Sequence, residues 1–91
     1  MNQKLTLYYT GRVQGVGFRY TVKQLAMGYD VVGTVKNLQD GRVELIIQGE
    51  KNELDAFREA VRECGLGSVI RHEEDFWSES LDDLHGFEIV R

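Results

Sequence analysis

A glycine-rich segment that ends in an arginine carries the clearest chemical pattern in this 91-residue sequence. Gly11, Gly15 and Gly17 fall between an alternating apolar run and a helical apolar pattern, and Arg19 lies two residues after Gly17. Glycines at a strand-to-helix junction free the backbone to curl, so that successive N–H groups can face one ligand beside the positive end of the helix dipole. The planar guanidinium of Arg19 can close on the same ligand with two parallel hydrogen bonds. The pattern predicts an anion site, although glycine spacing alone also fits a tight connection beside a surface arginine.

Two better-known phosphate-binding loops do not fit this segment. The dinucleotide-binding pattern needs a third glycine where the chain has Tyr20, and no parallel strand-helix-strand unit with a downstream ribose-binding acid follows. A Walker loop needs Gly-Lys-Ser/Thr, which the sequence does not contain. We therefore expect a different kind of anion cradle.

The other side chains of chemical interest indicate packing or surface roles. His72 and His85 lack the spacing of a metal site and are predicted to be surface or strand-face residues. Cys64, the only cysteine, cannot form an internal disulfide, and its place on an apolar helix stripe predicts a small core residue. Phe76 and Trp77 are expected to pack. The sequence thus predicts no metal site.

Hydrophobic periodicity places the glycine segment between a strand and a helix. Apolar and polar residues alternate over residues 4–12, which predicts a strand with one buried face. From Phe18 the apolar residues follow helical spacing, which predicts a helix over residues 18–28 with Gly28 as its C-terminal stop.

A hairpin is predicted next. Two runs rich in β-branched residues, 31–38 and 42–49, flank Asp40 and Gly41, and Asp-Gly is typical of tight hairpins. Such a turn needs a glycine at positive φ whether or not anything binds nearby. We therefore assign this dipeptide a structural role.

The second half of the chain supplies another helix and two strands. An apolar stripe predicts a helix over residues 52–64, with Asn52 as its N-cap and Gly65 beyond its end. Strands are expected over residues 69–77 and 87–90, joined by an acidic loop over residues 78–85. The predicted order is strand, helix, strand, strand, helix, strand, strand. This order matches the ferredoxin-like, split βαβ α+β arrangement, an antiparallel sheet of four to five strands with two helices on one face.

Composition and charge narrow the function classes. A chain of this length holds one domain, here residues 1–91, and its small core favours a monomer. The sequence has neither a long apolar run nor a signal-peptide profile, and it contains one cysteine. These features favour a cytoplasmic location without a membrane partner. A net charge of −4 disfavours nucleic-acid binding. Residues 1–42 nevertheless hold six basic and two acidic side chains, so we expect the anion site there.

Two motifs in this order resemble those of a known family. Residues 11–19 resemble the signature loop of the acylphosphatase family. Residues 33–41, Gly-Thr-Val-Lys-Asn-Leu-Gln-Asp-Gly, resemble its second motif, Gly-x-Val-x-Asn-x-x-Asp-Gly. The closing Phe-Glu-Ile of residues 87–89 resembles the family's Phe-x-Ile strand. The similarity extends over nearly the whole chain and includes its size and the order of its elements.

The resemblance implies an enzyme that hydrolyses the carboxyl-phosphate bond of small acyl phosphates to carboxylate and inorganic phosphate. It makes Arg19 the phosphate-binding residue and Asn37 the residue that positions the attacking water. The backbone amides that complete the phosphate site would be those of Gln14, Gly15, Val16, Gly17 and Phe18. Because a carboxylate is a good leaving group, the reaction needs mainly positioning and charge stabilisation, and we expect no metal, cofactor or covalent intermediate.

Other functions of the same fold are alternatives. A non-catalytic anion- or metabolite-binding ferredoxin-like module would keep the cradle without useful turnover. An RNA-recognition module should carry stacking aromatics on its central strands, but residues 42–49 contain none. A similar domain begins a large hydrogenase-maturation carbamoyltransferase, whose zinc motifs and catalytic domains are missing from this sequence. The free-standing enzyme is the preferred interpretation.

Overall fold

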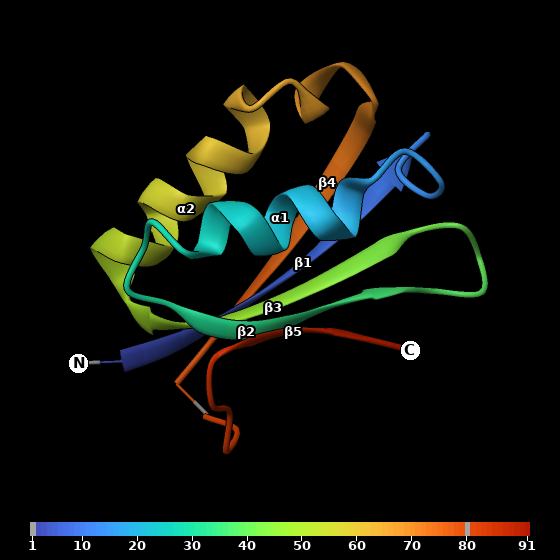
Figure 1. The fold of residues 1–91 in the computed structure, drawn as a ribbon. Coiled ribbons are helices and arrows are strands. Elements are labelled where there is room, and N and C mark those ends of the chain that lie inside the picture. Colours follow the sequence, from blue (N-terminus) through green and yellow to red (C-terminus); the bar gives the residue numbers. More distant parts are fainter. Residues whose placement is uncertain (1, 80) are drawn as a thin grey trace.

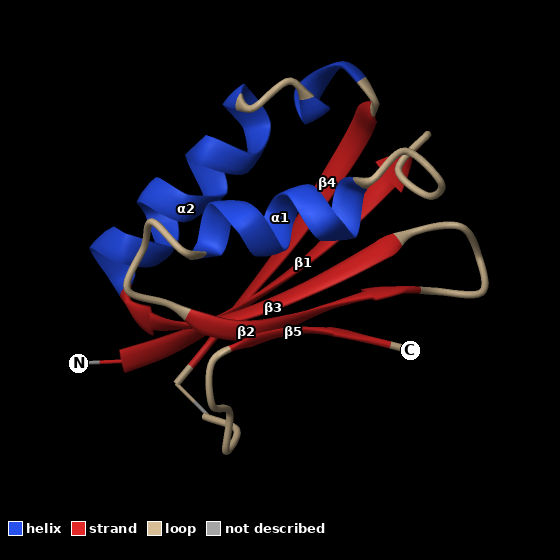
Figure 2. Ribbon diagram, viewed as in Figure 1, coloured by secondary structure: helices blue, strands red, loops and turns tan. Residues whose placement is uncertain are grey.

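The computed structural model describes residues 2–79 and 81–91, and in them two helices cover one face of a five-stranded sheet (Figures 1 and 2). A short 3-10 turn, Leu66–Ser68, follows the second helix. In chain order the main elements are β1 (Asn2–Gly11), α1 (Phe18–Ala26), β2 (Val32–Asn37), β3 (Val43–Glu50), α2 (Lys51–Glu63), β4 (Ile70–Ser78) and β5 (Phe87–Val90). This order confirms the predicted ferredoxin-like α+β class.

The sheet has the strand order β4-β1-β3-β2-β5, and four of its strands are antiparallel to their neighbours as predicted. At the edge, however, β5 pairs parallel to β2, so the expectation of an entirely antiparallel sheet was wrong there. The reason is topological. The chain leaves β4 at one edge, crosses the sheet near the end where β4 finishes, and enters β5 at the other edge in the direction of β2 (Figure 1).

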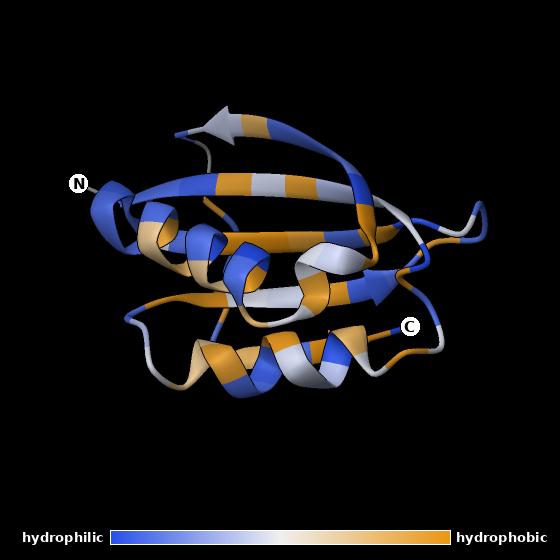
Figure 3. Cartoon of the chain, turned by 90° about the horizontal axis from the view of Figure 1, so that it is seen from above, coloured by the Kyte–Doolittle hydropathy of each residue, from blue (hydrophilic) through white to orange (hydrophobic). Residues whose placement is uncertain are grey.

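The core lies between the sheet and the two helices. Both helices are amphipathic, and hydrophobic and hydrophilic residues also alternate along strands of the sheet (Figure 3). Neither helix is long and apolar enough to cross a membrane. The core side chains are Leu5, Leu7, Tyr9, Val13, Phe18, Val22, Ala26, Val35, Val43, Leu45, Ile47, Leu54, Phe57 and Val61.

The ends of the helices differ from the sequence prediction in two places. At the end of α1 the cap is Met27 in right-handed geometry, and Gly28 does not adopt the positive φ of a glycine stop. At the start of α2 the cap is Glu50, because β3 runs directly into the helix, and Asn52 therefore falls inside the first turn.

The far end of α2 also corrects one side-chain prediction. Gly65 has φ +95° and follows the helix, as predicted. Cys64 is exposed and is not a core residue, because it caps the helix beyond the last buried stripe residue. Its thiol lies 3.2 Å from the carbonyl oxygen of Val61.

The second edge of the sheet, β4, is more exposed than predicted. Phe76 packs edge-on against Tyr8 on the face without helices but stays 55% exposed. Trp77 lies under the ammonium of Lys51 and is 37% exposed. His72 is exposed, as expected. An edge strand has a neighbour on one side only, so its large side chains are covered only in part.

The predicted acidic loop begins later than expected, because Ser78 still belongs to β4. Ser80 lies outside the described residues. Residues 81–86 form a connection on the sheet face away from the helices (Figure 1). Asp82 is held there by Lys4 and by the side chain of Gln48, and His85 is exposed as predicted.

Candidate active site

The glycine loop joins β1 to α1 and exposes unused backbone donors. Gly15 and Gly17 have φ of 78° and 77°, a left-handed geometry that glycine adopts without steric strain. Gly17 caps α1, and the first helical hydrogen bond runs from the N–H of Thr21 to its carbonyl, at 2.9 Å. Within the described residues, the N–H groups from Gln14 to Phe18 donate no hydrogen bond. Free donors at a helix start form an anion-binding arrangement.

Two attachments hold this loop in place. The N–H of Arg12 donates to the carbonyl of Val69 at 3.0 Å, and a Cβ at Gly11 would collide with that carbonyl. Farther along, the side-chain amide of Gln14 donates to the carbonyls of Leu38, at 2.8 Å, and Arg42, at 2.9 Å. The first attachment fixes the loop to the residue that precedes β4, and the second fixes it to the turn between β2 and β3.

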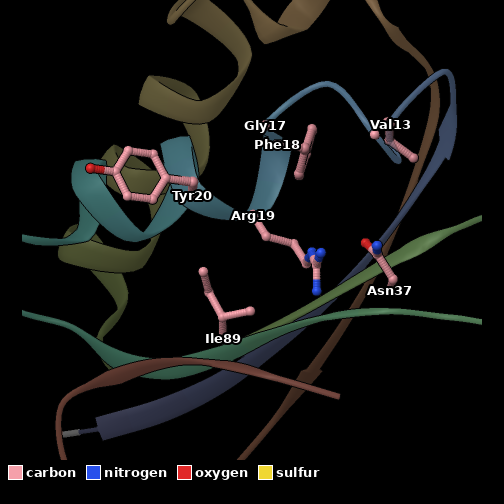
Figure 4. Close-up of a pocket in the computed structure, with 8 residues that line it drawn as sticks. Val13, Gly17, Phe18, Arg19, Tyr20, Asn37 and Ile89 are labelled. Atoms are coloured by element: carbon pink, nitrogen blue, oxygen red, sulfur yellow. The ribbon is translucent and has the colours of Figure 1, made fainter.

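A pocket of about 170 Å³ opens between this loop, the first turn of α1 and the ends of β2 and β5 (Figure 4). It is smaller than the roughly 300–1,000 Å³ of sites that enclose drug-sized ligands, so it suits a group of about phosphate size. No acidic side chain of the described part of the chain lines it. The lining residues are Val13, Gly15, Gly17, Phe18, Arg19, Tyr20, Asn37 and Ile89.

Arg19 supplies the positive charge of the pocket. It stands on the first turn of α1 and points across the pocket toward Asn37 (Figure 4). Its side chain is half-buried and forms no ion pair with any described carboxylate. The first turn of α1 also contains no acidic residue. An unpaired guanidinium beside free backbone N–H groups makes the pocket attractive to an anion.

Asn37 supplies an unused hydrogen-bond acceptor on the other side of the pocket. It is the last residue of β2 and lies on the helix-covered face, the face that buries Val35. Its Oδ1 atom is buried and has no hydrogen-bond partner among the described residues. A buried acceptor without a donor is unfavourable unless a ligand or water fills the place.

The structure thus brings together five of the seven residues predicted for the site, which are Gly15, Gly17, Phe18, Arg19 and Asn37. Gln14 and Val16 belong to the same loop but do not line the pocket. The side chain of Gln14 instead ties the loop to the hairpin turn. Within the described residues, no group of three or more metal-ligating side chains lies close enough to hold a metal ion.

Three lining residues were not predicted from the sequence. Val13 is fully buried and anchors the loop in the core. Tyr20 follows Arg19 on α1 and is 64% exposed. Ile89 belongs to β5, and it reaches the pocket because β5 pairs with β2. Its apolar alternation predicted a strand, but nothing in that pattern indicates which neighbour the strand joins.

A partly buried charge cluster lies outside the pocket, between α2 and β4. Glu73 pairs with Arg58 at 3.0 Å and also with Arg62, and Arg58 pairs with Asp75 at 2.8 Å. Burial opposes ionisation of Glu73, but hydrogen bonds from Arg62 and Arg58 hold the pKa of its carboxyl below the usual value. Burial raises the pKa of the neighbouring Tyr9 hydroxyl. This cluster therefore belongs to the scaffold.

Comparison with known proteins agrees with this geometry. The sequence model of the acylphosphatase family matches residues 5–89. The chain belongs to the acylphosphatase family. An acylphosphatase of Listeria welshimeri is 45% identical over 82 residues, which are 89% of this chain and 88% of that protein. The family and enzyme class predicted from the two motifs are therefore confirmed.

Solved structures show the same fold. The crystal structure of the Bacillus subtilis acylphosphatase matches with a TM-score of 0.83 and 38% identity over the whole of both chains. Full-length HypF, crystallised in a phosphate- and nucleotide-bound form, matches all of this chain with a TM-score of 0.88 and 31% identity. The match spans only 12% of that larger protein. The acylphosphatase fold thus occurs both in small proteins and within a larger one.

Proposed function

We propose that this acylphosphatase hydrolyses small acyl phosphates with Arg19 and the glycine loop as the phosphate site and Asn37 as the water-positioning residue. One observation carries the proposal: an unpaired guanidinium and an unpartnered buried amide oxygen face one phosphate-sized pocket. They come from different elements, α1 and β2, and each lacks the partner that the proposed substrate or water would supply.

The phosphoryl group occupies the pocket first. Its oxygens accept hydrogen bonds from the free loop amides between Gln14 and Phe18, at the positive end of α1. Arg19 closes on two further oxygens with its planar fork. These donors stabilise the charge on the transferring group, which is the main requirement of phosphoryl transfer.

Water then attacks phosphorus from the side of Asn37. The Oδ1 atom of Asn37 accepts one hydrogen of the water and aims its lone pair at phosphorus. The new bond forms between the water oxygen and phosphorus, while the bond from phosphorus to the acyl oxygen breaks and its electron pair leaves with the carboxylate. The proton released by the water passes to a phosphate oxygen. A carboxylate leaves without protonation, so the pocket needs no general acid.

The proposal also includes the binding partners, the cellular location and the oligomeric state. The pocket accommodates a small molecule, so we propose a free acyl phosphate as substrate and inorganic phosphate as product, without nucleic-acid or membrane partners. We propose that the protein acts as a cytoplasmic monomer.

The test is hydrolysis of acetyl phosphate by purified protein with a chelator present. Arg19→Lys should lower kcat/KM roughly a hundredfold or more, because a point charge does not replace two aligned donors. Arg62→Lys is the matched control on α2, outside the pocket, and should retain its activity. Circular dichroism verifies that both variants fold.

Three results would contradict the proposal. Loss of activity with chelator would indicate a metal. Full activity of Arg19→Lys would remove Arg19 from the phosphate site. Phosphate binding by folded protein without any turnover would favour the non-catalytic anion-binding module.

A further inference from the structure

A second hollow continues from the phosphate pocket along the seam between α1 and β5. It measures about 240 Å³ and is lined by Lys23, Ala26, Met27, Val31, Gly86 and Phe87. We refer to it as the α1–β5 groove. Tyr20 of the pocket and Lys23 of the groove lie one turn apart on α1. Ile89 and Phe87 likewise lie on the same face of β5, so the two hollows follow one another along one seam.

Several large apolar side chains along this seam are exposed to solvent. Tyr20 is 64% exposed, Met27 is 80% exposed and Ile89 is 36% exposed. Among the described residues, Lys23 is the only charged one that lines the groove, and its apolar stem can lie along it while the ammonium stays in water. Neighbouring apolar side chains left in contact with water beside a binding pocket indicate a place for an apolar ligand group.

The geometry of the proposed reaction directs the acyl group toward this seam. In phosphoryl transfer the attacking and leaving oxygens lie roughly in line, on opposite sides of phosphorus. With water held by Asn37, the leaving carboxylate must face away from Asn37. Figure 4 shows Asn37 on one side of the Arg19 side chain and Tyr20 and Ile89 on the other. The acyl group therefore leaves the pocket where the apolar seam begins.

We propose that the α1–β5 groove binds the acyl chain of the substrate, and that the enzyme prefers acyl phosphates with unbranched, medium-length apolar chains. This inference rests on the phosphate site proposed above. From Arg19 to Met27 the helix rises about 12 Å over eight residues, which gives room for an extended chain such as octanoyl. Tyr20 and Ile89 contact its first carbons, and Phe87 and Met27 contact its end.

The groove has a distinct kinetic signature. It touches the part of the substrate that does not change during the reaction, so it binds ground state and transition state equally and lowers KM without raising kcat. In a half-open groove each added methylene should raise kcat/KM about twofold. Octanoyl phosphate should therefore exceed acetyl phosphate in kcat/KM by roughly ten- to a hundredfold.

The experiment measures kcat and KM for acetyl, butanoyl, hexanoyl and octanoyl phosphate, below the concentration at which the longest forms micelles. Tyr20→Ala should lower the octanoyl-to-acetyl ratio of kcat/KM roughly fivefold, through KM. Tyr20→Phe keeps the ring and should keep the ratio. Phe76→Ala removes an exposed aromatic ring from the opposite sheet face and is the matched control.

The outcomes separate this inference from the proposed function. If acetyl phosphate is not hydrolysed, the phosphate site itself fails. If acetyl phosphate is hydrolysed but kcat/KM does not rise with chain length, the groove does not bind the acyl chain. A rise with chain length that Tyr20→Ala and Phe76→Ala reduce equally also overturns the proposal, because the preference then lies elsewhere. A rise carried by kcat at unchanged KM contradicts it as well.

Discussion

Gln14 offers the sharpest test of how the two halves of the site are held together. Its side-chain amide bridges the glycine loop to the carbonyl of Leu38, directly after Asn37, and to that of Arg42. Gln14→Ala removes both bonds, each worth about 1 kcal/mol. Leu38 still accepts the N–H of Gly41, and Arg42 still accepts the N–H of Leu38, so no carbonyl is left without a donor. We therefore expect the free energy of unfolding to fall by about 1–2 kcal/mol.

The effect on activity should fall mainly on kcat. The loop amides and Arg19 belong to one continuous segment and keep their phosphate geometry, while the distance from that segment to Asn37 is no longer fixed. We expect kcat to fall roughly tenfold, which corresponds to about 1.4 kcal/mol, with the inhibition constant of inorganic phosphate changed by less than about threefold. Urea unfolding and acetyl phosphate kinetics measure the two quantities.

Two further variants make this test specific. Gln14→Glu replaces the donor with a carboxylate, which cannot donate to carbonyls when ionised, so it should lower kcat at least as much as alanine. Gln24→Ala, at an exposed glutamine of α1 whose side chain has no hydrogen bond to the described residues, is the control. If Gln14→Ala loses stability but keeps full kcat, the bridge is structural only and the reasoning about Asn37 is refuted.

Two other variants address Asn37 and the scaffold. Asn37→Ala should lower kcat roughly a hundredfold in acetyl phosphate kinetics and leave competitive inhibition by phosphate nearly unchanged; an equal loss of phosphate affinity would place Asn37 in the phosphate site. Folding lowers the pKa of the Glu73 carboxyl below its ordinary value of 4.5. The ion pairs of Glu73 therefore contribute their full stabilisation at pH values above 4.5, and this contribution is lost as the pH falls through the lowered pKa. Glu73→Gln should therefore lower the free energy of unfolding by about 2 kcal/mol at pH 7, and this difference from the parent protein should disappear in acid. An equal difference at neutral and acidic pH, measured by urea unfolding, would contradict this.

The meeting of Arg19 and Asn37 in one pocket was predictable because local patterns indicate both residues. Glycines before a helix indicate a bent backbone, and the two motifs together identified Arg19 and Asn37 before any geometry was known. The hairpin turn was predictable for the same reason, since Gly41 takes the positive φ, +95°, that the turn demands. These are properties of segments shorter than ten residues.

What the sequence did not predict depends on distant neighbours. The alternation in β5 indicates a strand but not its parallel pairing with β2, and the contribution of Ile89 to the pocket follows from that pairing. Cys64 shares the helical period of the buried stripe, yet it caps α2 where the helix ends. The bridge made by Gln14 likewise joins residues 24 and 28 positions apart, a separation that periodicity does not report.

The topology explains why the proposed phosphate site lies at this end of the sheet. In the order β1-β3-β2, strands β1 and β2 run in the same direction with β3 between them, so their C-terminal ends lie at the same end of the sheet. Val43, at the start of β3, pairs with Tyr9 on one side and Asn37 on the other. Two strand spacings, about 10 Å, therefore separate Asn37 from Tyr9, two residues before the end of β1. The glycine loop spans this gap, so Arg19 and Asn37 line one pocket with room for the proposed phosphoryl group between them.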